Sequence, residues 1–242
     1  MTRHSSALPI APGLQVDPRR AVWLPEFAVL VIADLHLGYV WVERSRGALL
    51  PLVSDDAPRR LLELIADYQP RQCVFLGDTL HATAEFDVLG SELSELINAI
   101  GSRCQLHFVL GNHDRNLAQL VARLGFYIPC TRTLRCGPHL LVHGDEFRPA
   151  DLEGDLDPAG FIIYGHEHPA INVGDGVTTQ LKVPCFLAGH RRLVLPAFSR
   201  WSAGQVIGRQ ALLSHLTPPG DFRSAIAILG DHLLPIPLRW ES

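Results

Sequence analysis

The fold is decided by the stretch Leu106-His107-Phe108-Val109-Leu110-Gly111-Asn112-His113-Asp114. It has the pattern of a short buried strand, over residues 106–110, that stops at a glycine and releases three polar residues in a row. Gly111 predicts a tight backbone turn at this point. The polar residues then stand at the C-terminal edge of a strand, where α/β folds place their sites. Buried polar groups need partners, and the rest of the sequence should supply them.

Four other apolar runs end in the same way. Each is followed by residues whose side chains bind metals: Asp34 and His36 after 27–33, Asp78 after 73–76, His143 after 140–142, and His166 and His168 after 161–164. Each motif alone is weak, because an Asp-x-His pair arises easily by chance and a Gly-Asp after a strand is commonly a turn. Five such motifs, all at strand ends, are hard to explain by structure alone. The sequence therefore predicts that they meet at one site.

The elements between these motifs indicate a layered α/β fold. Helical periodicity follows Asp55 or Asp56, either of which could cap a helix that has Pro58 in its first turn. Further helices are expected from Phe86 to residue 100 and over 117–124, and a loop is expected around 43–47. The first strand is expected at Val22. Beyond residue 140 strands predominate, at 140–142, 161–164, 185–188, 192–195, 226–229 and 236–238.

Two of these features define the architecture further. Pro235 and Pro237 place the last strand at the edge of a sheet. Early βα units followed by a run of strands predict a sandwich of two sheets with helices outside. No linker divides the chain, so we expect a single domain over residues 1–242, with a core at about 21–200 and an extension at 201–242 that carries no readable motif.

Composition favours a cytoplasmic protein. Hydrophobic residues make up 47% of the 242 residues, and no apolar run approaches the roughly 20 residues that a membrane span needs. The first 14 residues contain no secretory apolar region. The five cysteines form no CxxC pair and are expected to be reduced and mostly buried. A net charge of −4 gives no overall attraction to nucleic acid, although bound metal ions can carry positive charge locally.

The residue types favour a pair of metal ions. Two dications about 3.5–4 Å apart repel each other, so an anionic group must bridge them. A carboxylate can do this, whereas an imidazole nitrogen has only one lone pair. Asp78, from the middle strand, is the best bridge. The remaining donors divide between the ions: Asp34, His36 and one of His166 and His168 on the first, and Asn112, His143 and the other histidine on the second.

The charge of such a site suits a phosphate. Two dications contribute a charge of about +4, and Asp34, Asp78 and a bridging hydroxide contribute −3. The residual charge of about +1 attracts an anion. A neutral Asn112 preserves this attraction, which a third carboxylate would weaken. Mixed nitrogen and oxygen donors fit manganese, iron or zinc better than calcium.

Taken together, the motifs Asp34-Leu35-His36, Gly77-Asp78, Gly111-Asn112-His113-Asp114, His143-Gly144 and Gly165-His166-Glu167-His168 resemble those of the calcineurin-like metallophosphoesterases. The resemblance covers roughly residues 21–200. It implies a four-layer α/β/β/α sandwich with two mixed β-sheets and a dinuclear site. It also implies that Asp34, His36, Asp78 and His168 bind the first metal, and that Asp78, Asn112, His143 and His166 bind the second.

A narrower resemblance rests on shorter motifs. Asp34-Leu35-His36-Leu37-Gly38, the following Arg44-Ser45-Arg46-Gly47, Leu76-Gly77-Asp78 with His81, and Leu195-Pro196-Ala197-Phe198 look like the bacterial DNA-ligase-associated phosphoesterases. This resemblance implies a manganese-dependent phosphodiesterase or nuclease that works beside a DNA ligase and a helicase.

Several other residues are candidates for supporting roles. The resemblance implies that His113 faces the substrate, and Asp114 could hold its ring and tautomer. His81 could lie behind the metal ligands, contact the substrate or simply be exposed. Arg44 and Arg46 could clamp a phosphate with their forked donors, or only be solvated. The tryptophans are expected to serve packing rather than base stacking: Trp23, Trp41, Trp201 and Trp240.

The sequence thus predicts a dinuclear phosphoesterase that hydrolyses a phosphodiester in a nucleic acid, with a role in DNA repair. Three alternatives stay open. One is an enzyme for cyclic nucleotides, nucleotide anhydrides or phosphomonoesters, which the lack of a basic face favours. The second is a binding scaffold without catalysis, which has no need of His113. The third is a redox role for the histidine-rich site. The sequence does not indicate an oligomeric state.

Overall fold

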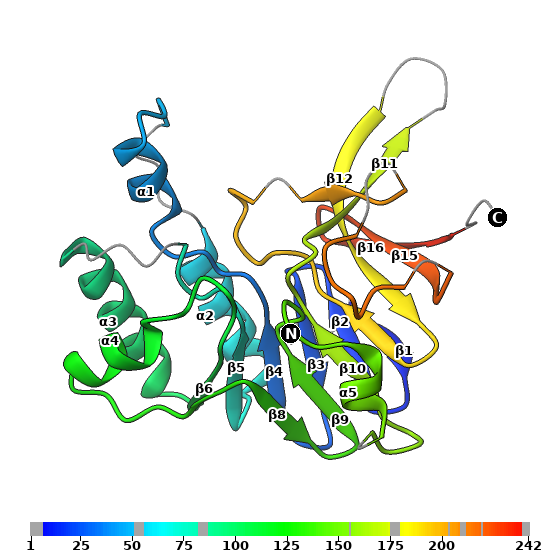
Figure 1. The fold of residues 1–242 in the computed structure, drawn as a ribbon, viewed down its shortest axis with the longest axis horizontal. Helices are drawn as coiled ribbons and strands as arrows, with labels where there is room; N and C mark the ends of the chain where they lie inside the picture. Colours follow the sequence, from blue (N-terminus) through cyan, green and yellow to red (C-terminus); the bar gives the residue numbers. More distant parts are fainter. Residues whose placement is uncertain are drawn as a thin grey trace.

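The computed structural model describes residues 7–50, 56–81, 87–154, 156–174, 180–202, 204–208, 212–218 and 220–238. Two β-sheets pack against each other (Figure 1). The first has seven strands in the order β1 (Leu8–Ala11), β2 (Leu14–Asp17), β3 (Ala21–Leu24), β4 (Val29–Ile32), β5 (Gln72–Leu76), β6 (Gln105–Val109) and β7 (Cys130–Thr131). Strands β4 to β7 run parallel, and β1 to β4 are joined antiparallel.

The second sheet has nine strands. Along its main path the order is β14 (Gln205–Val206), β11 (Pro169–Gly174), β12 (Gln180–Gly189), β13 (Arg192–Val194), β10 (Ile162–Tyr164), β9 (His139–Val142) and β8 (Thr133–Cys136). Strand β15 (Phe222–Leu229) pairs with β12, and β16 (His232–Pro237) pairs with β15. Strand β10 lies parallel to both β9 and β13.

The described helices lie outside the two sheets (Figure 1). They are α1 (Tyr39–Ser45), α2 (Ala57–Tyr68), α3 (Asp87–Gly101), α4 (Leu117–Arg123) and α5 (Pro149–Glu153). The buried strands face two cores. In β5, Cys73 and Phe75 pack against the helix layer, whereas Val74 and Leu76 pack against the second sheet. A third cluster covers the other face of the second sheet with residues of α5 and of segment 212–218. These layers are those of the predicted α/β/β/α sandwich.

Two expectations about the N-terminal part were wrong. The strand at Val22 is β3 rather than the first strand, because the hairpin β1–β2 precedes it and turns at Gly13 with φ 71°. The prolines at positions 9 and 12 hid this hairpin, although Leu14 is fully buried. The expected loop around 43–47 is largely helix α1. Its one buried residue, Val42, gave no apolar periodicity to recognise.

Other expectations are confirmed. Asp56 is the N-cap of α2 and Pro58 lies in its first turn, although the Asp56 side chain bonds Arg60 rather than the helix backbone. Strand β16 is an edge strand. All five cysteines are free, and four are buried. Asp55, Phe86 and Trp240 lie outside the described residues. Within the described part, no helix is both long and apolar enough to span a membrane.

Candidate metal centre

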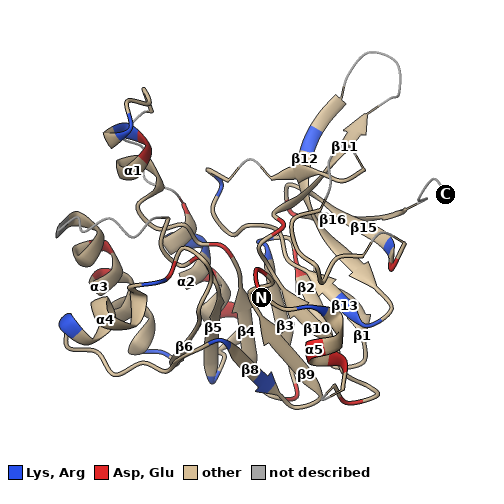
Figure 2. Ribbon diagram, in the orientation of Figure 1, with Lys and Arg blue, Asp and Glu red and all other residues tan. Residues whose placement is uncertain are grey.

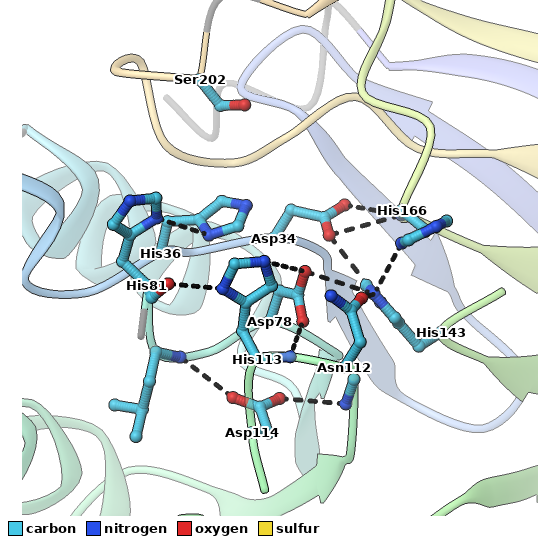
Figure 3. A network of polar contacts seen from close by, with 12 residues as sticks. Asp34, His36, Asp78, His81, Asn112, His113, Asp114, His143, His166 and Ser202 are labelled. Carbon is cyan, nitrogen blue, oxygen red and sulfur yellow. Dashed lines mark hydrogen bonds and ion pairs between the residues drawn. The ribbon is translucent and has the colours of Figure 1, made fainter. Parts of the chain in front are cut away.

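The five predicted motifs follow the C-terminal ends of β4, β5, β6, β9 and β10, and they meet where the two sheets adjoin (Figure 3). Backbone hydrogen bonds hold the loops together beyond the strands. The amide of Asp34 donates to the carbonyl of Gly77 at 3.1 Å, and that of His36 to the carbonyl of Asp78 at 2.9 Å. Later in the chain, the amide of Phe198 donates to Ala33 at 2.7 Å. The loops after β4 and β5 therefore form a fixed platform.

Glycines before the polar residues make room for neighbouring donors. A Cβ on Gly77 would lie 2.0 Å from Nδ1 of His143, and one on Gly165 would lie 2.4 Å from Oδ2 of Asp34. Gly111 was predicted to permit a tight turn, but its φ is not positive. Its role is spatial, because a Cβ there would lie 2.4 Å from Oδ1 of Asp78. Each of these three glycines thus leaves room for a side chain from another motif.

Gly111→Ala should consequently damage the site. The new Cβ would also lie 2.6 Å from the backbone nitrogen of Asp78, which cannot rotate away. We expect activity to fall by at least about 10²-fold, as for an active-site displacement of about 1 Å. Steady-state kinetics and elemental analysis would measure the loss. Gly101→Ala is the matched control, because no heavy atom lies within 4 Å of its added Cβ. Equal activity of the two variants would contradict this role.

The backbone at this centre is strained. Among the described residues, eight non-glycine residues have a positive φ, and five of them are predicted ligands: Asp34, His36, Asp78, His166 and His168. Such conformations cost about 1–3 kcal/mol each and persist where surrounding contacts determine them. One such contact is the amide of His166, which donates to the Asp34 carboxylate at 3.1 Å. Because these strained conformations gather at predicted ligands, we infer that they are retained for the side-chain positions they produce, at a cost in stability.

Donor atoms of three residues converge in a first cluster. Nε2 of His36 lies 3.2 Å from Nε2 of His168, and Nε2 of His168 lies 3.2 Å from Oδ1 of Asp34. Two donors on one ion, each with a bond of about 2.0–2.2 Å, are separated by about 3–3.5 Å. The spacing in this cluster matches that of ligands around a single ion.

A second cluster lies beside the first. Nε2 of His143 is 3.3 Å from Oδ2 of Asp78, 3.2 Å from Oδ1 of Asn112 and 3.2 Å from Nδ1 of His166. These four residues come from four different strand ends, and Figure 3 shows their side chains directed toward one another. Oδ1 of Asp78 also accepts a hydrogen bond from the amide of His113 at 2.9 Å. The second cluster therefore provides two oxygen and two nitrogen donors.

The far side of two of these rings faces an oxygen atom, as is usual for metal-binding histidines. Nδ1 of His168 donates to Oγ of Ser202 at 2.5 Å, and Nδ1 of His143 faces the carbonyl of Leu76 at 3.3 Å. Burial lowers the pKa of His36 to about 3, so its ring is neutral and has a free lone pair. His36 therefore offers a nitrogen lone pair to the first cluster without first losing a proton.

The two buried carboxylates of the centre require positive charge nearby. Asp34 and Asp78 are 0% and 2% exposed, and the partners recorded for their ion pairs among the described residues are histidines. Burial alone would lower the pKa of His143, but its hydrogen bond to Asp78 and the charge of Asp34 raise it to about 9. Two buried anions that raise the pKa of a buried imidazole in this way indicate a centre that binds cations.

Asp114 does not have its predicted role. Its carboxylate was expected to hold the ring of His113, but it accepts three backbone hydrogen bonds instead, from Thr79 at 3.2 Å, Leu80 at 3.0 Å and Gly111 at 3.1 Å. Burial raises the pKa of Asp114 to about 6, against the effect of these donors. The residue joins the loop after β5 to the loop after β6.

His113 is oriented by a backbone carbonyl. Its Nδ1 donates to the carbonyl oxygen of His81 at 2.5 Å, which leaves Nε2 as the free ring nitrogen. Nε2 lies 4.0 Å from Oδ2 of Asp78, and 37% of the side chain is exposed. The ring thus borders the second cluster while facing solvent, where a substrate could reach it.

His81 connects the centre to helix α1. Its Nδ1 lies 3.3 Å from Nδ1 of His36, and its Nε2 lies 3.3 Å from Oε1 of Glu43. His36, His81 and His113 are close enough to form a third donor group. However, Nε2 of His36 already faces His168, and Nδ1 of His113 is bound to a carbonyl. We therefore interpret His81 as a support for His36 rather than as a ligand.

The two arginines predicted to bind phosphate have other partners. Arg44 donates to the carbonyl of Leu50 at 2.5 Å, and Arg46 pairs with Glu43 at 2.7 Å. Among the described residues, Arg46 is connected to the centre through its ion pair with Glu43, which in turn contacts His81. Both are on or next to the exposed helix α1, and either would have to exchange its partner to reach a phosphate.

Two supporting residues were missed by sequence reasoning. Ser202, in the unreadable segment, fixes the ring of His168. Glu167 is buried and accepts hydrogen bonds from the amides of Leu213 and Ser214, at 2.9 and 2.6 Å, and from the hydroxyl of Thr217 at 2.8 Å. Only the position of Glu167, an acid between two predicted ligands, indicated such a role. Both residues attach the segment beyond 200 to the His166–His168 loop.

The fold and the two donor clusters define a metal-dependent phosphoesterase. The family model described as calcineurin-like phosphoesterase matches residues 27–166, which is more than half of the chain, and the chain belongs to this family. Its members use a dinuclear metal centre. A search of the curated proteins gave no match.

Among solved structures, the chain is similar to the crystal structure of Pseudomonas putida nuclease MPE. The TM-score is 0.66 at 22% sequence identity, and the match covers 96% of this chain and 99% of that one. At this identity the similarity shows a common fold.

Proposed function

We propose that the protein is a manganese-dependent phosphodiesterase that hydrolyses nucleic acid. The observation that carries this proposal is the pair of donor clusters around two buried carboxylates. The similarity to a structure named as a nuclease supports a nucleic-acid substrate. Mixed oxygen and nitrogen donors suit manganese, with iron or zinc as alternatives.

Seven side chains would hold the two ions. We assign Asp34, His36 and His168 to the first and Asn112, His143 and His166 to the second, with Asp78 shared between them. The geometry supports the two groups, because each contains donors 3.2–3.3 Å apart. When bound, the ions would supply Lewis acidity toward the phosphate oxygens and activate a water molecule as the nucleophile.

His113 would serve the leaving oxygen. Because the carbonyl of His81 accepts the Nδ1 proton, the protonated ring carries its second proton on Nε2. This nitrogen borders the clusters and is accessible to solvent. The backbone amide of His113 also donates a hydrogen bond to Asp78. This contact fixes the position of the proposed acid, His113, relative to the proposed bridging ligand. His81 would support both His36 and His113.

The charge distribution favours a limited contact with the nucleic acid. Figure 2 shows Arg and Lys interspersed with Asp and Glu along the ribbon, in line with the net charge of −4. Binding would therefore rely on the centre itself, with Arg44 and Arg46 as further phosphate contacts. The same observation keeps one alternative in consideration, an enzyme for cyclic nucleotides, nucleotide anhydrides or phosphomonoesters.

Diesters should be hydrolysed faster than monoesters. A residual charge of about +1 at the centre would compensate a monoanionic diester better than a dianionic monoester. Bis(p-nitrophenyl) phosphate and p-nitrophenyl phosphate, compared under manganese and accompanied by a single-stranded DNA, would measure the preference. Faster turnover of the monoester would contradict the proposal, and cleavage of chromogenic substrates without cleavage of DNA would favour the small-molecule alternative.

We also propose a cellular role for the protein. The resemblance to DNA-ligase-associated phosphoesterases supports a role in DNA repair beside a ligase and a helicase, in the cytoplasm. The single domain over residues 1–242 is supported by the core that both sheets share.

A further inference from the structure

A cavity of about 560 Å³ lies beside the first donor cluster. It is formed by helices α1, α2 and α3, the loop after β4 and Trp201. His36, one of the proposed ligands, belongs to its wall. Most of the other lining is apolar and includes Leu35, Leu37, Leu62, Leu96 and Ala99. Apolar cavities of this size that carry a few polar groups are typical binding sites for small molecules and parts of larger substrates.

A row of aromatic rings connects this cavity to the proposed acid. Trp201 and Tyr39, both in the cavity wall, are nearly parallel, with an angle of 8° and centroids 6.3 Å apart. Tyr39 lies 4.4 Å from the ring of His81, which in turn is stacked on His113 at 5.7 Å. A flat group bound against Tyr39 or Trp201 would therefore adjoin the metal centre.

The charge of the cavity indicates which part of a substrate it takes. Glu92 and Glu95 line it, and its described lining contains no lysine or arginine. Oε1 of Glu92 accepts a hydrogen bond from Nε1 of Trp41 at 2.9 Å. Carboxylates repel a phosphate, whereas they accept hydrogen bonds from the exocyclic amino groups of bases. The fitting occupant is an uncharged, planar group with N–H donors.

We propose that this cavity binds the nucleobase of the nucleotide next to the scissile phosphate. The inference rests on the proposed function and specifies its substrate as a strand whose bases are free to leave a stack. Trp201 and Tyr39 provide the stacking surface, and Glu92 and Glu95 provide acceptors. Trp41 and Trp201, predicted to serve packing, are thereby assigned to substrate binding. Base–aromatic stacking tolerates different sequences, because each base has a flat face.

The test compares a single-stranded trinucleotide with the same molecule lacking its central base. Calorimetry on the manganese-loaded chain, with non-hydrolysable phosphonate linkages in both molecules, measures binding without turnover. We expect the complete trinucleotide to bind about 5- to 150-fold more tightly, which is the range for one stacked base. Trp201→Leu should remove this preference and Trp201→Phe should largely retain it. Tyr127→Ala is the matched control, because Tyr127 is fully exposed and lies outside the cavity.

The outcomes separate this inference from the proposed function. Equal binding of the two trinucleotides, or binding of neither, would overturn the base-binding cavity, as would a Trp201→Leu variant with an unchanged preference. The proposed function fails by a different result, namely a manganese-loaded chain that hydrolyses a chromogenic monoester but cleaves neither trinucleotide when these carry natural phosphodiester linkages. In that case the difference in affinity between the two trinucleotides would still show whether the cavity binds a base.

Discussion

Asp78→Ala should abolish turnover and the binding of metal at both positions. Asp78 is the proposed shared ligand, and its loss would expose two dications to each other without an anion between them. Removing one electrostatic contact from an active site costs about 10²–10³-fold, so we expect a loss of more than about 10³-fold in kcat. Elemental analysis of the purified variant should find less than one metal per chain.

Asp17 offers a control for this substitution. It is an equally buried aspartate, 1% exposed, whose carboxylate bonds Arg19 and Tyr68 and belongs to neither donor cluster. Asp17→Asn should lower the melting temperature, because its buried partners lose a charged acceptor. It should retain both metals and nearly normal kcat per folded chain. If Asp78→Ala retained two metals, the proposed sharing would be wrong.

His113→Ala should leave both metals bound and strongly reduce turnover of nucleotide diesters. The ring belongs to neither donor cluster, but its free Nε2 borders the second one. General acid catalysis contributes about 10²–10⁴-fold, or roughly 3–5 kcal/mol of barrier. A nucleotide alkoxide leaves poorly without a proton, whereas p-nitrophenolate is already stable. Parallel kinetics on the two kinds of diester should therefore show a much larger loss for the nucleotide.

Asp114 provides the contrast for His113. Its carboxylate holds three backbone amides and not the His113 ring, so Asp114→Asn should weaken the loops that carry Asp78 and Asn112. We expect it to slow both substrates by similar factors and to lower thermal stability. Loss of a metal from His113→Ala would disprove the ligand assignment. Equal slowing of both substrates by His113→Ala would indicate that the ring binds phosphate rather than serving the leaving group.

The positions of the proposed ligands could be predicted because the signal is local. Each apolar run and the polar residues after it lie within about ten positions, and parallel strands bring their C-terminal ends to one edge. The structure confirms these strand ends for Asp34, Asp78, Asn112, His143 and His166. Nothing in this pattern required knowledge of distant residues.

Contacts between distant segments could not be predicted. Asp114 accepts hydrogen bonds from residues 34 and 35 positions away, and Ser202 meets His168 across 34 positions. The chain gives no periodic signal for such pairs. Helix α1 escaped recognition for a related reason, because its rings serve the cavity beside His36 rather than an apolar core. The unrecognised features are therefore mostly those that serve the site.

The most direct test of the central claim is a crystal structure of the manganese-loaded protein with anomalous diffraction data. The account predicts two manganese peaks about 3.5–4 Å apart, one among Asp34, His36 and His168, the other among Asn112, His143 and His166, with the Asp78 carboxylate between them. A single peak, or a manganese ion held by His36, His81 and His113, would contradict it.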